Sequence, residues 1–198
     1  SLLFARTPGP GLKTYAVLLL AAALATSYTN GEWLTFGRTL CPPFSFYDGV
    51  CLFIEDLIRV ATPFFLARSF FRNERDLRDL LRVLVGCALF YSVLALIEVQ
   101  LSPQFHRWVY GFHQHDFQQT LRFGGYRPMV FMQHGLDLSM LMATALLGAG
   151  ALAKADQRIG RLPGTLMTAW LALVVLACKS LGAILHAAIG APVVLLWK

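Results

Sequence analysis

The chain has 198 residues, of which 57% are hydrophobic and only 14% are charged, and its formal net charge is +6. A soluble domain needs more charged side chains to cover its surface, so this composition argues against a soluble globular protein. A net positive charge would suggest nucleic-acid binding in a soluble protein. Here, however, the cations lie mostly at the ends of apolar blocks, where they set membrane topology or contact lipid head groups. We therefore expect a membrane protein that does not bind nucleic acid.

Six apolar segments are candidates for membrane helices, each of which needs about 20 mostly apolar residues. They span roughly residues 13–29, 49–70, 80–101, 128–153, 164–179 and 181–197. The last two are short and separated only by Lys179 and Ser180, which predicts either two helices with a tight turn or one interrupted helix. The expected fold class is all-α: one multi-pass transmembrane bundle of about six segments over residues 1–198.

The two ends of the sequence predict a fragment of a longer protein. The chain starts with Ser1 rather than Met, and it stops at Lys198 directly after an apolar run. Arg6 and Lys13 precede the first apolar segment, as in a signal peptide, but several more apolar segments follow. We therefore expect a retained first membrane helix.

Basic loops predict the orientation in the membrane. Residues 72–82 carry four arginines, and residues 154–161 carry one lysine and two arginines. Enrichment in lysine and arginine marks cytoplasmic loops. If each segment crosses once, both loops and the basic N-terminal region share the cytoplasmic side. Residues 30–48 and 102–127 then lie on the opposite side.

The outer stretch 102–127, between the third and fourth segments, is the longest polar stretch of the chain. Within it Phe105, Trp108, Val109 and Phe112 recur at helical spacing. This pattern predicts a short helix or loop lying at the membrane interface.

Arginine and histidine concentrate in residues 102–134. The ionisable residues there are His106, Arg107, His113, His115, Asp116, Arg122, Arg127 and His134. A guanidinium group presents paired donors that match phosphate oxygens, and Gly124-Gly125 would let the backbone approach a head group closely. An equally consistent interpretation is that these side chains only anchor a loop at the lipid interface.

The sequence His113-Gln-His115-Asp116 resembles a metal-binding cluster. A zinc site, however, needs three or four ligands in defined geometry, and nothing nearby completes the set. We expect neither a metal ion nor a cofactor.

Ionisable residues inside apolar segments are functional candidates by default. Glu55 and Arg59 are spaced i,i+4 in the second segment, so we expect them to form an ion pair within the bundle. Glu98 lies near the outer end of the third segment, where it is either solvated or faces the outer stretch. Asp137 follows His134 by three residues and could orient its imidazole.

Three motifs resemble the O-antigen ligase and polymerase family. Arg122-Phe-Gly-Gly-Tyr-Arg127-Pro-Met-Val-Phe-Met-Gln-His134-Gly runs directly into an apolar helix, where that family carries an arginine, a Gly/Phe stretch and then His or Asn. Cys178-Lys179-Ser180-Leu-Gly-Ala183 resembles the family's Ser-Arg-Gly-Ala element, although Lys179 precedes Ser180 where the family often has Ser before Arg. Leu101-Ser-Pro-Gln-Phe-His106 also lies where the family would have it. The resemblance covers roughly residues 45–195, and the chain ends before the family's large second periplasmic loop.

The resemblance implies glycan transfer on the periplasmic face of a bacterial inner membrane. The implied donor is a glycan linked to undecaprenyl diphosphate, and the implied acceptor is a lipid A core, a growing glycan or a protein. Breaking the sugar–phosphate bond leaves a lipid diphosphate whose developing charge needs stabilisation. We assign Arg122 and Arg127 to that role, with His134 as a supporting donor or proton carrier.

The substrate-binding residues assigned with them are Arg107, His113, Gly124, Gly125, Lys179 and Ser180. The activating base is expected in the part of the protein beyond this fragment. Two alternatives remain open at this point. A transporter or flippase would bind the lipid-linked glycan with the same cations and perform no chemistry, and a structural membrane subunit would do neither.

Overall fold

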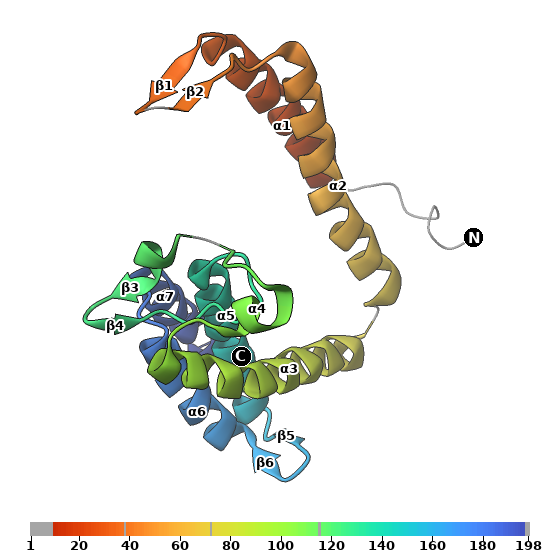
Figure 1. The fold of residues 1–198 in the computed structure, drawn as a ribbon. Helices are drawn as coiled ribbons and strands as arrows, with labels where there is room; N and C mark the ends of the chain where they lie inside the picture. The colour runs from red at the N-terminus through yellow and green to blue at the C-terminus, as the bar shows by residue number, and fades with distance from the viewer. Residues whose placement is uncertain (1–9, 38, 72, 115, 197–198) are drawn as a thin grey trace. The chain divides into compact units, whose positions relative to one another are not determined.

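The computed structural model describes residues 10–37, 39–71, 73–114 and 116–196, and within them the chain is mostly helical (Figure 1). The helices are α1 (Pro10–Thr29), α2 (Phe46–Phe70), α3 (Glu74–Leu101), α4 (Phe105–Tyr110), α5 (Gly135–Lys154), α6 (Gly164–Ala177) and α7 (Leu181–Leu196). This agrees with the expected all-α class.

Three short antiparallel hairpins connect the helices. They pair β1 (Leu34–Phe36) with β2 (Thr39–Cys41), β3 (Leu121–Arg122) with β4 (Gly125–Tyr126), and β5 (Arg158–Ile159) with β6 (Leu162–Pro163). A 3-10 turn, η1 (Phe117–Thr120), precedes β3. The chain folds as two compact units, Ser1–Glu74 and Arg75–Lys198.

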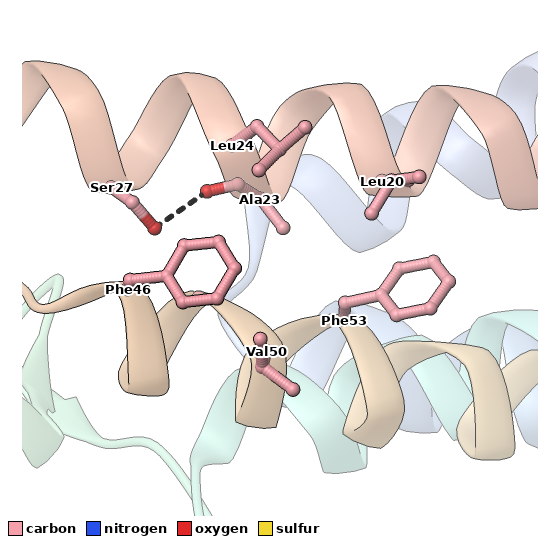
Figure 2. Close-up of a pocket in the computed structure, with 8 residues that line it drawn as sticks. Leu20, Ala23, Leu24, Ser27, Phe46, Val50 and Phe53 are labelled. Atoms are coloured by element: carbon pink, nitrogen blue, oxygen red, sulfur yellow. Dashed lines mark hydrogen bonds between the residues drawn. The ribbon is translucent and has the colours of Figure 1, made fainter.

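In the first unit α1 packs along α2. Figure 2 shows their contact, where a small cavity of about 50 Å³ is lined by Leu20, Phe46 and Phe53 among others. The Ser27 hydroxyl donates to the Ala23 carbonyl at 2.9 Å, one turn back in α1. A Cβ atom at Gly49 of α2 would lie 3.4 Å from the Ala23 carbonyl oxygen, so the two helices approach closely at this glycine.

The start of α2 is fixed by a capping box. Ser45 Oγ accepts a hydrogen bond from the Asp48 amide at 3.2 Å, and Asp48 Oδ2 accepts one from the Ser45 amide at 2.8 Å. Hydrogen bonding to Ser45 also lowers the pKa of Asp48. The box explains why α2 begins three residues earlier than the apolar run predicts.

The core of the second unit lies between α5, α6 and α7. Helix α3 adds a buried stripe at helical spacing, formed by Val85, Ala88, Ser92, Ala95 and Glu98. The stripe is held at both ends and in the middle by polar contacts. Arg82 Nη2 donates to Gln157 Oε1 at 2.5 Å near the β5–β6 hairpin. Trp170 Nε1 on α6 donates to Ser92 Oγ at 2.8 Å.

Among the described residues, α3 and α5 are the two helices long and apolar enough to cross a membrane. Only 22% of the most apolar stretch of α3 is buried against the rest of the chain. Phe90 on this helix is 72% exposed. An apolar helix that is mostly uncovered is typical of a lipid-facing surface rather than of a soluble core. Helices α6 and α7 are apolar but shorter.

Two further helices begin at residues other than those that the apolar runs predict. Helix α3 begins at Glu74 rather than near residue 80, because the charged residues there continue the helix and Arg82 pairs with Asp79 at 2.9 Å. Helix α5 begins at Gly135 rather than at residue 128, because the intervening loop is bound by side chains from elsewhere. Helices α6 and α7 are separate, with Lys179 at φ +51° in the turn between them, which supports the two-helix alternative.

Candidate functional site

The motif that begins at Arg122 folds first into the β3–β4 hairpin. Arg122 pairs with Gly125, and the two residues between them, Phe123 and Gly124, have φ values of +48° and +69°. Positive φ at both central positions is the type I′ geometry, which glycine adopts without strain. Gly124 therefore has a turn-forming role of its own. The hairpin residues 121–126 line an open hollow of about 390 Å³.

Three cations meet at this hairpin, and we call Arg122, Arg127 and Lys179 the cationic cluster. The Nζ atom of Lys179 lies directly against Gly125, so that a side chain at Gly125 would collide with it. The buried Cys178 thiol, next to Lys179, is close enough to Arg127 for an electrostatic interaction. The turn between α6 and α7 is thereby brought to the loop that precedes α5.

Arg127 is the most constrained member of the cluster. Its backbone amide donates to the Thr120 carbonyl at 2.7 Å, and its side chain crosses the first residue of α5, Gly135. Its Nε atom is buried without a hydrogen-bond partner. Burial, and secondarily the charge of Arg122, lowers the pKa of Arg127.

In the described part of the chain, no acidic side chain neutralises the cluster. Among the residues that the structure describes, no carboxylate lies within 4.0 Å of a side-chain nitrogen of Arg122, Arg127 or Lys179. Like charges held together repel each other, and an anion between them would relieve that repulsion. The geometry therefore suits a ligand with several negatively charged oxygens, because a guanidinium group offers paired donors to phosphate.

His134 lies at the start of α5 as its N-cap. Its Nδ1 accepts the Leu136 amide at 3.0 Å, so the neutral imidazole carries its proton on Nε2 and can donate there. Asp137 lies exposed in the first turn of α5, and the Leu136 amide rather than Asp137 orients the ring.

His113, Arg107 and Ser180 are the assigned residues that remain. The His113 ring is 5.8 Å from that of Phe117, which in turn is 6.1 Å from that of Tyr126 on β4. Arg107 is exposed on α4, and within the described chain no hydrogen bond or ion pair joins it to the cluster. Ser180 is buried where α7 begins, and its carbonyl accepts the Ile184 amide at 3.1 Å.

The possible metal site at residues 113–116 is only partly described. His115 lies outside the described residues. Among those described, no group of three or more His, Cys, Asp or Glu side chains is arranged to hold a metal ion.

One residue without a role assigned from sequence is central to the site. The Glu98 carboxylate is 1% exposed and accepts three backbone amides, one at the start of α4 and two in the loop before α5. The sequence indicates this role only through the presence of an acid near the end of an apolar segment. The partners of Glu98 are backbone amides, which every residue except proline carries, so no sequence motif marks them.

Comparison of the chain with protein-family models, with curated proteins and with solved structures finds no match. Its function is therefore argued from the geometry of the cationic cluster and from the resemblance of its motifs.

Proposed function

We propose that this chain binds a lipid-linked glycan through its diphosphate and takes part in transferring the glycan to an acceptor, as the O-antigen ligase and polymerase resemblance implies. The observation that carries the proposal is the cationic cluster around Gly125, which has no acidic partner among the described residues. Its members come from two motifs that are distant in the sequence, and both motifs belong to the resemblance.

The chemistry assigns a task to each member. An acceptor hydroxyl attacks the anomeric carbon of the donor sugar, and the bond from that carbon to the diphosphate oxygen breaks. Negative charge grows on the departing diphosphate, where Arg122, Arg127 and Lys179 stabilise it without a metal ion. His134, whose Nδ1 accepts the Leu136 amide, can donate its Nε2 proton to the same oxygens. The proton of the acceptor hydroxyl passes to a general base, a role that the positively charged arginine and lysine side chains cannot fill.

The proposed location is the periplasmic face of a bacterial inner membrane. If α3 and α5 each cross once, the cationic cluster lies on the side opposite the basic loops at 72–82 and 154–161. The helices α1, α2, α6 and α7 would supply the other segments of the expected bundle of about six. Exposed aromatic side chains on α4, Trp108 and Tyr110, would then contact the lipid interface.

The deciding experiment measures glycan transfer by the full-length protein reconstituted into vesicles of phosphatidylethanolamine and phosphatidylglycerol. We expect the Arg122→Ala/Arg127→Ala variant to lose transfer, and Arg127→Lys to remain impaired because lysine keeps the charge but not the paired donors. Arg161→Ala is the matched control, since this exposed arginine lies in the β5–β6 hairpin. Near-normal transfer by the double variant would remove the cluster from the mechanism.

Two further outcomes identify the alternatives. Movement of the lipid-linked glycan across the bilayer, without transfer, would favour a transporter or flippase. Loss of transfer on chelation, restored by a divalent ion, would revive a metal site near His113.

A further inference from the structure

Glu98 is a buried acid with an unusual set of partners. Its Oε1 accepts the Phe105 amide at 3.0 Å, and its Oε2 accepts the Met129 and Val130 amides at 2.9 and 2.7 Å. A buried carboxylate is tolerated when charged only if such bonds replace its lost hydration. Three backbone donors fulfil that condition without any cationic side chain.

These bonds hold two segments that are far apart in the sequence. Phe105 begins α4, whereas Met129 and Val130 belong to the segment 127–134, which we call the arginine loop. Val130 has a φ of +53°, a conformation that a β-branched residue adopts only when its surroundings enforce it. The Glu98 carboxylate supplies that enforcement at the Val130 amide.

Further side chains hold the same loop. The hydroxyl of Tyr91, two turns before Glu98 on α3, accepts the Phe131 amide at 3.1 Å. The amide nitrogen of Gln114 donates to the carbonyls of Val130 and Met132 at 3.1 and 2.9 Å. The loop is therefore tied to the end of α3 and not only to its own helix α5.

The arginine loop sets the place of Arg127. Only Pro128, which is buried and has a fixed φ, separates Arg127 from the Met129 amide that Glu98 binds. On its other side the Arg127 side chain packs across Gly135. A shift of the Met129–Val130 backbone would thus displace the guanidinium.

The same hydrogen bonds explain why Glu98 does not form an ion pair with the cationic cluster. A buried carboxylate that holds the loop of an arginine would ordinarily be its ion-pair partner. Here its lone pairs are directed at backbone amides, so the cationic cluster stays available to an external anion.

We propose that Glu98 is a positioning residue that holds the arginine loop, and through it Arg127, in the geometry that binds a diphosphate. The ligand class rests on the proposed function, whereas the hold on the loop does not. The test therefore measures the hold on the loop and the binding of diphosphate separately, on the full chain in detergent. The variants are Glu98→Gln and Glu98→Asp, and the control is Gln100→Ala, an exposed neighbour on α3.

The first measurement is hydrogen exchange at the Met129 and Val130 amides. We expect Glu98→Gln to reduce their protection by at least about tenfold, because each bond to a charged acceptor contributes a factor of that order. Amides in the middle of α5 serve as an internal check of folding and should stay protected. Unchanged protection at Met129 and Val130 would overturn the proposal.

The second measurement is the affinity for inorganic diphosphate, and its sign separates positioning from simple electrostatics. Removing a negative charge near three cations would by itself raise the affinity for an anion. Positioning predicts the opposite, a loss of about tenfold in Glu98→Gln. It also predicts a loss in Glu98→Asp, where the charge is kept but the carboxylate is drawn back from the loop.

The outcomes are distinct. Reduced protection together with reduced affinity supports the proposal, and reduced protection with unchanged or raised affinity overturns it. If the unaltered chain binds no diphosphate, the proposed function loses its cation site, and the exchange measurement alone decides whether Glu98 holds the loop.

Discussion

Gly135→Ala displaces the Arg127 side chain without removing it, and so tests whether the position of this side chain matters for binding and transfer. A Cβ atom at this position would lie 2.5 Å from Arg127 Cδ, 2.8 Å from Cγ and 3.0 Å from the Pro128 carbonyl oxygen. Ordinary carbon–carbon contacts lie at about 3.5–4.0 Å. The Arg127 side chain must therefore move by about 1 Å, while its charge and hydrogen-bonding capacity are unchanged.

Two effects on stability oppose each other in this variant. Overpacking of a well-packed site lowers the free energy of unfolding by about 1–3 kcal/mol. Replacing glycine by alanine in a helix returns up to about 1 kcal/mol. We expect a net loss of at most about 3 kcal/mol, which is below the roughly 5–15 kcal/mol of a typical folded domain, so the protein should still fold. A displacement of about 1 Å can nevertheless lower a rate about 100-fold when a group must be aligned with a reacting bond.

The assay compares thermal unfolding, diphosphate affinity and glycan transfer in the same preparation. Gly86→Ala on α3 is the matched control, because no heavy atom lies within 4 Å of a Cβ built there. We expect the control to keep its diphosphate affinity and Gly135→Ala to lose at least about tenfold, in line with a weakened charge-assisted bond. Normal affinity and transfer in Gly135→Ala would show that the position of Arg127 has no role in binding.

Three further outcomes are expected. In a cysteine-free background, labelling from the periplasmic side should modify Gln118→Cys and not Arg75→Cys, and the reverse pattern would invert the topology. A double-mutant cycle tests the ion pair in α2, in which Glu55 Oε1 and Arg59 Nη2 lie 2.6 Å apart. If α2 lies in the membrane, the coupling energy should exceed the roughly 0.3–0.5 kcal/mol of water-exposed helix pairs. Additive losses of stability would exclude a pair. Lys154→Met should lower the free energy of unfolding by about 0.3–1 kcal/mol, because the ammonium group donates to two carbonyls in the last turn of α7. An unchanged melting temperature would show that these hydrogen bonds do not stabilise the helix end.

Sequence alone predicted the helices well, because an apolar run long enough to span a bilayer is a local property. It placed the start of α5 too early for a physical reason. The apolar residues Met129 and Val130 continue the hydrophobic pattern, but their amides bind Glu98 and cannot take part in a helix. Binding of backbone amides by a distant side chain leaves no periodicity to detect.

The candidate site was predictable in its parts and not in its arrangement. Local motifs predict a role for each of Arg122, Arg127 and Lys179, and the glycine pair predicts a close approach of the backbone to another group. The structure shows what approaches Gly125, namely the Lys179 ammonium group, and this contact joins two motifs separated by two helices. Arg107 is a candidate from its charge alone, and it is exposed on α4. The charge of a residue does not by itself predict whether that residue lies near the cationic cluster.

The arrangement also explains why so many neutral contacts surround three cations. Repulsion between Arg122 and Arg127 opposes their proximity, and after burial, which is the main cause, the charge of Arg122 contributes to the lowered pKa of Arg127. The loop is therefore held by interactions that carry no compensating charge at the cluster itself. Backbone amides bind Glu98, the hairpin turns at Gly124, and the side chain of Arg127 packs on Gly135. A salt bridge would have held the arginines more simply, but it would have filled the place of an anionic ligand. A fold that holds cations together through backbone contacts keeps that place open, which is the property a diphosphate site requires.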